Sequence, residues 1–232
     1  MKKQIYLLSI AFLMLLSCSS GDNSNSQDNN NSSTTVSDID GNVYSSVLIC
    51  NQTWMKSNLN VSKYRNGDVI PQVTDATQWA TLKTGAWCYY ANTSSNGTTY
   101  GKLYNWYAIK DARGLAPTGY HIPSEAEWNS LANCLGGNNV AGGKLKENGV
   151  DHWVSPNLAA TNSSAFTGLP GGTRDQLGDF FNIGNVGYFW ISSENTLTNV
   201  WGRYLYCDGT DLGYDDVFIA KTYGFSVRCL KD

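Results

Sequence analysis

The stretch GYHIPSEAEW, residues 119–128, describes the start of a helix residue by residue. Ser124 and Glu127 have the S-x-x-E spacing of a capping box, in which each side chain accepts a backbone N–H that the first helical turn leaves without a partner. Pro123 and Trp128 stand at the positions of a hydrophobic staple. The apolar residues that follow recur at i, i+3, i+4 and i+7 and predict one buried face: Trp128, Leu131, Ala132 and Leu135.

The same stretch contains a histidine and two carboxylates, which are also the residue types of catalytic sites. Carboxylates in the first turn of a helix are stabilised by the helix dipole, so Glu125 and Glu127 have a structural role before any catalytic one. His121 precedes the helix, and we expect it to be packed or hydrogen-bonded rather than to act as a ligand. The pair Gly136-Gly137 is expected to end the helix.

Beyond this helix, the sequence predicts further helical segments before it and strands on both sides of it. A short helix is predicted over 75–83, with Asp75 as its N-cap, and residues 100–111 suit either a helix or an extended chain. Helices early and strands late favour an α+β domain built on antiparallel sheet. Strands are predicted at 43–49, 52–55, 86–90, 188–192, 202–207, 217–221 and 224–230.

The N-terminus has the features of a secretory signal. Lys2 and Lys3 precede an apolar run over residues 5–16, which is shorter than the roughly 20 residues that cross a bilayer. The junction LLSC, residues 15–18, resembles the bacterial lipobox, whose cysteine becomes acylated. An ordinary cleaved signal followed by an incidental cysteine is the alternative.

These features divide the chain into three parts. We expect a signal peptide over 1–18 with lipidation at Cys18, then a disordered polar tether over 19–35, and then a single domain over 36–232. The tether contains no apolar side chain, so it cannot offset the entropy of ordering. The expected location is the outer membrane or the cell surface, with the membrane as a partner through the lipid.

Charge and residue counts exclude several classes of function. The formal net charge is −3 and the five arginines are scattered, so nucleic acid is not an expected partner. His121 and His152 are the only histidines, and there is no G-x-S-x-G motif, which disfavours a catalytic triad. Five cysteines follow Cys18, and Cys88 and Cys229 each lie in a strand-like aromatic run. We predict that these two form a disulfide, although spacing alone does not determine connectivity.

Six segments resemble the Fibrobacter succinogenes major paralogous domain, a family of secreted bacterial modules without an established activity. The similarity extends over nearly the whole expected domain in one order. The segments are DIDGNVY at 38–44, NQTWMKSNLNVSKYRNGD at 51–68, YGKLYNWYA at 100–108, GLAPTGYHIPSEAEWNSL at 114–131, LPGGTRD at 169–175 and GFSVRCLKD at 224–232.

A more distant resemblance links residues 123–128 and 224–229 to the formylglycine-generating, sulfatase-modifying enzymes. This resemblance implies a C-type-lectin-like mixed fold with short antiparallel sheets, two or three helices, long loops, adjacent termini and a loop-rich binding face. The enzymes' chemistry does not carry over. They use two closely spaced cysteines, whereas Cys207 and Cys229 are far apart in this sequence.

Aromatic residues interleaved with amides and carboxylates predict a binding face between Gly171 and Tyr223. Such neighbours suit a sugar ring, with its apolar face and hydroxyl rim, and equally suit a protein partner. We expect Phe180, Trp201 and Tyr214 to be exposed in loops. The full set of candidate ligand-binding residues is Phe180, Asn182, Trp201, Tyr204, Asp211 and Tyr214.

Two other features of this region have structural interpretations. Four aspartates could hold calcium, although a solvated acidic loop is the stronger interpretation, and we expect no metal site and no cofactor. Gly171-Gly172 predicts a tight turn followed by a surface pair of Arg174 with Asp175. The aspartates are Asp208, Asp211, Asp215 and Asp216.

The sequence therefore favours a non-enzymatic, lipid-anchored envelope protein whose domain binds glycan or protein. One alternative is a hydrolase acting on cell-wall or dietary polysaccharide, which would need two carboxylates across a cleft. The other is a structural component of the envelope without a soluble ligand.

Overall fold

The computed structural model describes residues 34–194 and 199–232, apart from the side chains of residues 199 and 215–218. The described residues lie in one compact unit. The expected signal peptide, Cys18 and nearly all of the expected tether lie outside the described residues. In the described part of the chain, no helix combines the length and apolar character that a membrane span requires.

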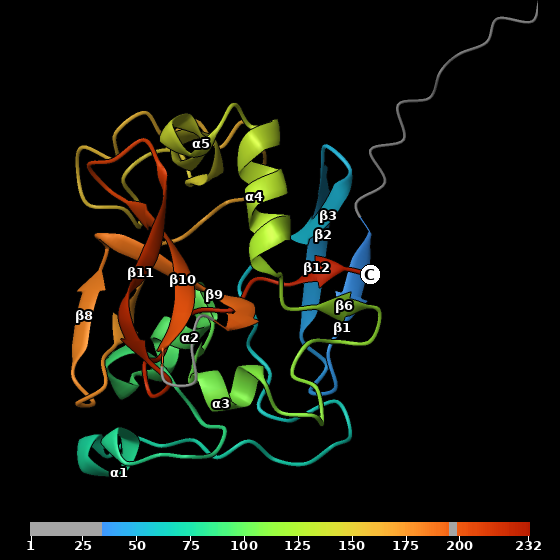
Figure 1. Ribbon diagram of the computed structural model, residues 1–232, viewed down its shortest axis with the longest axis vertical. Coiled ribbons are helices and arrows are strands. Elements are labelled where there is room, and N and C mark those ends of the chain that lie inside the picture. Colours follow the sequence, from blue (N-terminus) through green and yellow to red (C-terminus); the bar gives the residue numbers. More distant parts are fainter. Residues whose placement is uncertain (1–33, 195–198) are drawn as a thin grey trace, which may run out of the picture. The chain divides into compact units, whose positions relative to one another are not determined.

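The first sheet brings the beginning and the end of the described chain together (Figure 1). Its pairings are all antiparallel, and Leu230 lies between Trp54 on one side and His121 on the other. This proximity agrees with the adjacent termini that the lectin-like resemblance implies. In spatial order the strands are β1 (Thr35–Ser37), β2 (Val43–Ile49), β3 (Gln52–Met55), β12 (Leu230–Lys231) and β6 (Tyr120–His121).

The second sheet contains the longest strands. Its pairings are antiparallel, except that β7 and β9 pair in parallel through Gly172 and Gly187. β8 is an edge strand of this sheet. In spatial order the strands are β11 (Leu212–Ala220), β10 (Asn199–Tyr206), β9 (Val186–Glu194), β7 (Gly171–Arg174) and β8 (Phe180–Ile183). A two-stranded sheet pairs β4 (Trp87–Cys88) with β5 (Leu103–Tyr104).

The helices are short and begin at side-chain caps in three cases. Asp75 accepts from the Gln78 N–H before α1, Asn105 caps α3, and Ser124 caps α4. The predicted capping box of Ser124 and Glu127 is confirmed. The helices are α1 (Ala76–Ala80), α2 (Ser94–Tyr100), α3 (Trp106–Ile109), α4 (Glu125–Cys134) and α5 (Asn138–Leu145), with a 3-10 turn η1 (Tyr90–Asn92).

Helix α4 lies between the two sheets (Figure 1), and its Trp128 side chain contacts both of them. The Trp128 ring lies 4.7 Å from Trp54 of β3 and 5.8 Å from Phe189 of β9, measured between centroids. Trp128, Leu131 and Ala132 are buried, as the helical spacing predicts. The helix that the opening stretch specifies is therefore the element around which the two sheets pack.

The expected α+β class with short, mainly antiparallel sheets is confirmed. Residues 100–111 contain both of the structures considered, because β5 and then α3 form there. The predicted strands at 86–90 and 224–230 are mostly irregular. Only Trp87–Cys88 and Leu230 belong to regular strands, while residues 224–226 form isolated bridges to Arg174, Tyr104 and Phe189.

Several buried cations donate hydrogen bonds to loop carbonyls in this fold. Lys146, 0% exposed, donates to the carbonyls of Leu158, Tyr206 and Gly209 at 2.8–2.9 Å. Burial lowers the pKa of Lys146, an effect that nearby acids partly oppose. A loop carbonyl cut off from water needs a donor, and a cation provides strong hydrogen bonds. Single side chains thus hold several loops together.

Arg174 is one of these cations, which corrects the expected surface pair with Asp175. Its guanidinium is 0% exposed and donates to the carbonyls of Gly178, Val73 and Thr74 at 2.9, 2.7 and 2.9 Å. The predicted tight turn at Gly171-Gly172 is also wrong, because these residues begin β7, all of which is buried. A charged residue beside an aspartate suggested a solvated pair, but backbone carbonyls from distant segments bind it instead.

The predicted disulfide between Cys88 and Cys229 is wrong. The structure pairs Cys50, in the turn between β2 and β3, with Cys134 at the end of α4, with 6.6 Å between the Cα atoms. Cys88, Cys207 and Cys229 are free and buried, each in a different hydrophobic cluster. Aromatic strand neighbours direct Cys88 and Cys229 into separate parts of the core, so their thiols cannot meet.

Candidate functional site

A pocket of about 240 Å³ opens beside the edge strand β8. We call it the aromatic pocket. Phe225, 1% exposed, belongs to its wall and to the buried hydrophobic cluster that also contains Trp106 and Trp190. The lining residues are Thr173, Asp175, Phe181, Asn182, Tyr188, Tyr223 and Phe225. These residues come from β7, β8, β9 and the segment before β12, so distant parts of the sequence build one concave surface.

Backbone pairing fixes the wall of the aromatic pocket. Arg174 and Gly224 exchange two backbone hydrogen bonds at 3.1 and 2.7 Å, which attaches the 223–225 segment to β7. The Tyr188 ring stacks on Phe225 with centroids 4.9 Å apart and planes at 13°, and Tyr223 meets Phe225 edge-on at 5.8 Å. Rings held in this way lose little freedom when a ligand binds, which favours affinity.

Polar groups stand at the rim of the same pocket. The Asn182 amide donates to the Tyr188 hydroxyl at 3.4 Å. Asp175 Oδ1 accepts the backbone N–H groups of Leu177 and Asp179 at 2.9 Å each. Phe181 is 48% exposed. The arrangement combines apolar ring faces with amide and carboxylate groups, which can contact the C–H face and the hydroxyl groups of a sugar.

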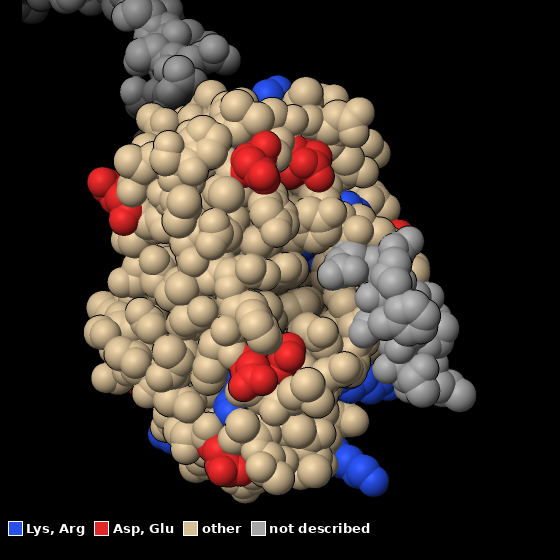
Figure 2. Space-filling view, turned by 90° about the vertical axis from the view of Figure 1, so that its left-hand side faces the viewer, with Lys and Arg blue, Asp and Glu red and all other residues tan. Residues whose placement is uncertain are grey.

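The face that contains β8 and β11 carries few charged side chains near its middle (Figure 2). Acidic residues occur there in small separate groups, and the visible lysines and arginines lie mainly towards its lower end. A surface of this kind suits a ligand held by ring stacking and neutral hydrogen bonds.

Of the six predicted ligand-binding residues, only Asn182 lines the aromatic pocket. Trp201 and Tyr214 pack on each other, with ring centroids 5.2 Å apart, and against the buried cluster that contains Trp128 and Phe189. The Tyr204 ring lies 6.3 Å from that of Tyr188 but does not line the pocket. Asp211 directly precedes β11, and its carbonyl closely approaches Gly142 of α5. The six residues therefore do not form one site.

The expected exposure of Phe180, Trp201 and Tyr214 is also wrong, because all three are partly buried. Phe180 pairs with Arg174 across β7 and β8 and lies 4.8 Å from its guanidinium. Its neighbour Phe181 pairs with Thr173 on the opposite face, which is the pocket face. The sequence indicates that the side chains of two adjacent phenylalanines in a strand point to opposite faces of the sheet, but it does not indicate which of them faces outward.

The calcium alternative gains no support from the described side chains, among which no group of three or more His, Cys, Asp or Glu residues could hold a metal ion. Asp208 is exposed and Asp211 partly buried. The side chains of Asp215 and Asp216 lie outside the described residues.

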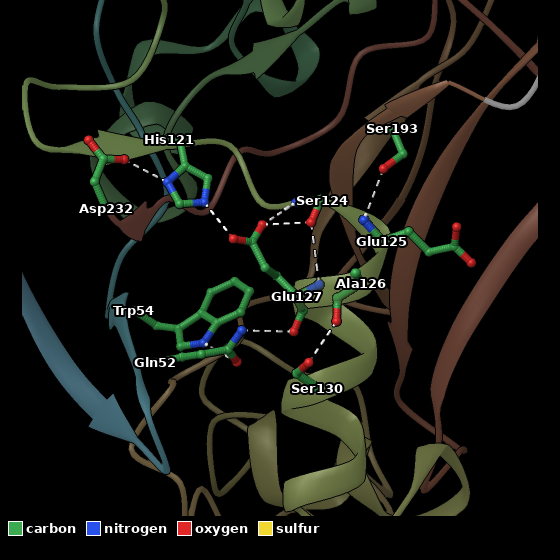
Figure 3. Close-up of polar contacts among 10 residues, drawn as sticks. All are labelled: Gln52, Trp54, His121, Ser124, Glu125, Ala126, Glu127, Ser130, Ser193 and Asp232. Carbon is green, nitrogen blue, oxygen red and sulfur yellow. Dashed lines mark hydrogen bonds and ion pairs between the residues drawn. The ribbon is translucent and has the colours of Figure 1, made fainter.

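His121 has a carboxylate on each ring nitrogen (Figure 3). Nδ1 lies 2.7 Å from Asp232 Oδ1, and Nε2 lies 2.9 Å from Glu127 Oε1. The other oxygen of Glu127 accepts the backbone N–H and the hydroxyl of Ser124, both at 2.7 Å. The predicted hydrogen-bonded histidine is confirmed. It ties the C-terminus to the capping box of α4.

Two acceptors on one imidazole favour its doubly protonated form, which donates from both nitrogens. Burial lowers the pKa of His121, but the hydrogen bonds to Asp232 and Glu127 outweigh this effect and raise the pKa above 6.5. Burial raises the pKa of Glu127, and its bonds to Ser124 and His121 reverse the shift, so the net direction is downward. The cluster is an ion-pair network at a helix start.

His152 is likewise held by a carboxylate, with Nδ1 2.8 Å from Glu147 Oε2. Neither histidine lines the aromatic pocket. Among the residues that the structure describes, Asp175 is the one acid that lines it. The pocket thus lacks both a neighbouring histidine base and a second described carboxylate.

Comparison with known proteins identifies the family of this chain and no individual relative. Residues 47–231 match the Fibrobacter succinogenes major domain. Neither the curated proteins nor the solved structures contain a significant match. The match extends from β2 to β12 and so includes every residue that lines the aromatic pocket. Because it covers most of the sequence, the chain belongs to the Fibrobacter succinogenes major domain family.

Proposed function

We propose that this domain is a non-enzymatic binding module whose aromatic pocket receives one sugar ring of a glycan. The observation that carries the proposal is the pair of tyrosines on Phe225, Tyr188 stacked at 4.9 Å and Tyr223 edge-on at 5.8 Å, with Asn182 and Asp175 at the rim. The volume of about 240 Å³ lies just below the roughly 300–1,000 Å³ of sites for drug-sized ligands, so a single ring suits it.

A binding role is supported over hydrolysis by the chemistry of the pocket. Glycoside hydrolysis uses two carboxyl groups about 5–9.5 Å apart, one on each side of the scissile bond. Asp175 is the single acid among the described lining residues, and its Oδ1 already accepts two backbone N–H groups. A protein ligand would use the same rings, and it is an outcome that the test distinguishes.

The test is a glycan array followed by isothermal titration calorimetry of the strongest hit. Tyr223→Ala removes one pocket wall, and we expect it to weaken binding at least about tenfold, equivalent to about 1.4 kcal/mol. Tyr206→Ala is the matched control, because Tyr206 is 37% exposed on β10 and does not line the pocket. Circular dichroism of both variants shows whether the fold is retained.

Three results would replace the proposal. Product release from a bound oligosaccharide would indicate the hydrolase. Binding of envelope proteins but no glycan, lost in Tyr223→Ala, would indicate a protein ligand. Absence of binding to both glycans and envelope proteins would favour a structural envelope component.

We further propose that lipid at Cys18 anchors the module at the outer membrane or cell surface. The support is the LLSC junction at residues 15–18 directly after an apolar run. Metabolic labelling with a fatty-acid probe should mark the wild-type protein and not Cys18→Ala. Equal labelling of both proteins would contradict the anchor.

A further inference from the structure

A second pocket, of about 280 Å³, has an excess of positive charge. We call it the cationic pocket. Its charged lining residues are Lys83, Lys110, Arg113 and Lys221 with Asp111 and Glu194, which gives 4 − 2 = +2. The whole chain has a formal charge of −3, so this concentration of cations runs against the overall balance.

Two of the four cations are already neutralised. Arg113 is bound by Asp111 at 2.8 Å and by Asp68 at 3.0 Å. Lys221 lies 3.8 Å from Glu194.

Lys83 and Lys110 have no carboxylate within ion-pair distance among the described residues, and the Lys110 ammonium lies 3.5 Å from the Ser192 carbonyl. Both lysines are exposed at the pocket, so an anionic group placed there would meet two ammonium groups that have no carboxylate partner among the described residues.

The cationic pocket adjoins the aromatic pocket through the segment 221–225. Lys221 lines the first, and Tyr223 and Phe225 line the second. Four residues span at most about 14 Å, because an extended chain covers about 3.3–3.6 Å per residue. One lining residue of each pocket therefore lies within about 14 Å of the other along the backbone, a distance comparable to two or three sugar rings.

The two pockets also share one support in the core. Trp190 packs against Trp106, which lines the cationic pocket, at 5.3 Å and against Phe225 at 4.5 Å. The backbone N–H of Trp106 donates to the Lys221 carbonyl at 3.0 Å, and Tyr104 and Phe225 exchange backbone hydrogen bonds at 2.9 and 3.1 Å. The relative position of the pockets is consequently fixed by packed rings and backbone pairing.

We infer that the ligand is an acidic glycan, with one ring in the aromatic pocket and the anionic substituent of a neighbouring ring in the cationic pocket. The inference rests on the proposed sugar-binding function and adds the chemical class of the sugar. The substituent is a uronate carboxylate or a sulfate ester, since either presents anionic oxygens to Lys83 and Lys110.

The experiment compares three oligosaccharides of equal length with the full-length protein: neutral, uronic-acid-containing and sulfated. Isothermal titration calorimetry is run at about 20 mM and about 200 mM NaCl, because salt screens exposed charges. We expect at least one acidic oligosaccharide to bind about tenfold more tightly than the neutral one at low salt, with most of this advantage lost at high salt. The carboxylate and sulfate arms identify the anion.

Variants test whether the tighter binding of acidic oligosaccharides depends on the cationic pocket. The double variant Lys83→Gln/Lys110→Gln should bind acidic and neutral sugars equally and leave neutral affinity unchanged. Lys231→Gln removes an exposed lysine of β12 outside the pocket and should retain the advantage. Tyr223→Ala should weaken all three sugars.

The possible failures are distinguishable. Equal affinity for neutral and acidic sugars in the wild type overturns the inference alone, as does an advantage that survives the double lysine variant. Absence of binding by all three sugars overturns the proposed function and the inference together.

Discussion

Replacing Arg228 by methionine should destabilise the protein far more than replacing any surface arginine. The Arg228 guanidinium is 0% exposed and has no carboxylate partner in the described structure. It donates to the carbonyls of Met55, Phe166 and Thr167 at 3.0, 2.5 and 3.2 Å and to Asn58 Oδ1 at 2.9 and 3.1 Å. Three loops thus meet at one side chain.

The magnitude follows from the acceptors that lose this donor. Three buried oxygens and the partly buried Thr167 carbonyl are affected, and a buried polar atom left without a partner costs about 1–3 kcal/mol. Methionine avoids the cost of burying a charge, which offsets part of the loss. Burial also lowers the pKa of Arg228, in line with that cost. We expect the free energy of unfolding to fall by about 4 kcal/mol, or Tm by about 8–16 °C at this chain length.

Urea unfolding followed by tryptophan fluorescence measures the effect, with Arg113→Met as control. Arg113 has two acidic partners but is 41% exposed, so solvent screens its ion pairs and its loss should destabilise the protein far less than the loss of Arg228. If Arg228→Met does not fold, Arg228→Lys keeps the charge and loses the fork of donors, and it should lie between the two. A free energy for Arg228→Met within about 1 kcal/mol of the wild type would refute this reasoning.

Three further predictions concern other parts of the fold. The pKa of His121 is raised in the folded state, so its contribution to stability is full below about pH 6.5 and is lost as pH rises through the folded-state pKa. In urea unfolding, the free energies of His121→Gln and the wild type should therefore differ more at about pH 5.5 than at about pH 8.5. A difference that does not change with pH would contradict this prediction. Cys134→Ser removes the disulfide between two residues that are 84 positions apart and should lower the free energy of unfolding by about 2–4 kcal/mol. An unchanged urea midpoint would argue against the disulfide, as would a thiol titration that finds Cys50 already free in the wild type. Gly142→Ala would place a methyl group against the Asp211 carbonyl oxygen and should push α5 away from β11. We expect this variant to have a lower Tm than the wild type. An unchanged Tm would show that the structure accommodates the methyl group without cost.

Features that depend on neighbours in the sequence could be predicted. The capping box of Ser124 and Glu127, the Asp75 cap and the buried face of α4 all form within one or two helical turns, so spacing alone reveals them. The strands at 43–49 and 52–55 were predictable for the same reason, because alternation and a short turn specify a hairpin. The α+β class follows from the order of such elements.

The candidate site could be predicted only as a region. Asn182 was identified, but Tyr188, Tyr223 and Phe225 join it only because residue 224 pairs with β7 and residue 226 with β9. The choice between Phe180 and Phe181 depended on whether Arg174 was buried, and two of its three carbonyl partners, Val73 and Thr74, lie about a hundred positions earlier in the sequence. No local pattern contains that information.

By itself, the sequence determined the helix start at residues 119–128, the mixed class of the fold and the low histidine count, since each depends on composition or on interactions over a few residues. The tertiary structure alone decided which cysteines pair, which arginines are buried and which aromatic rings face solvent. These outcomes depend on long-range packing, where a carbonyl, a thiol or a ring is stabilised by whichever partner the fold brings within reach.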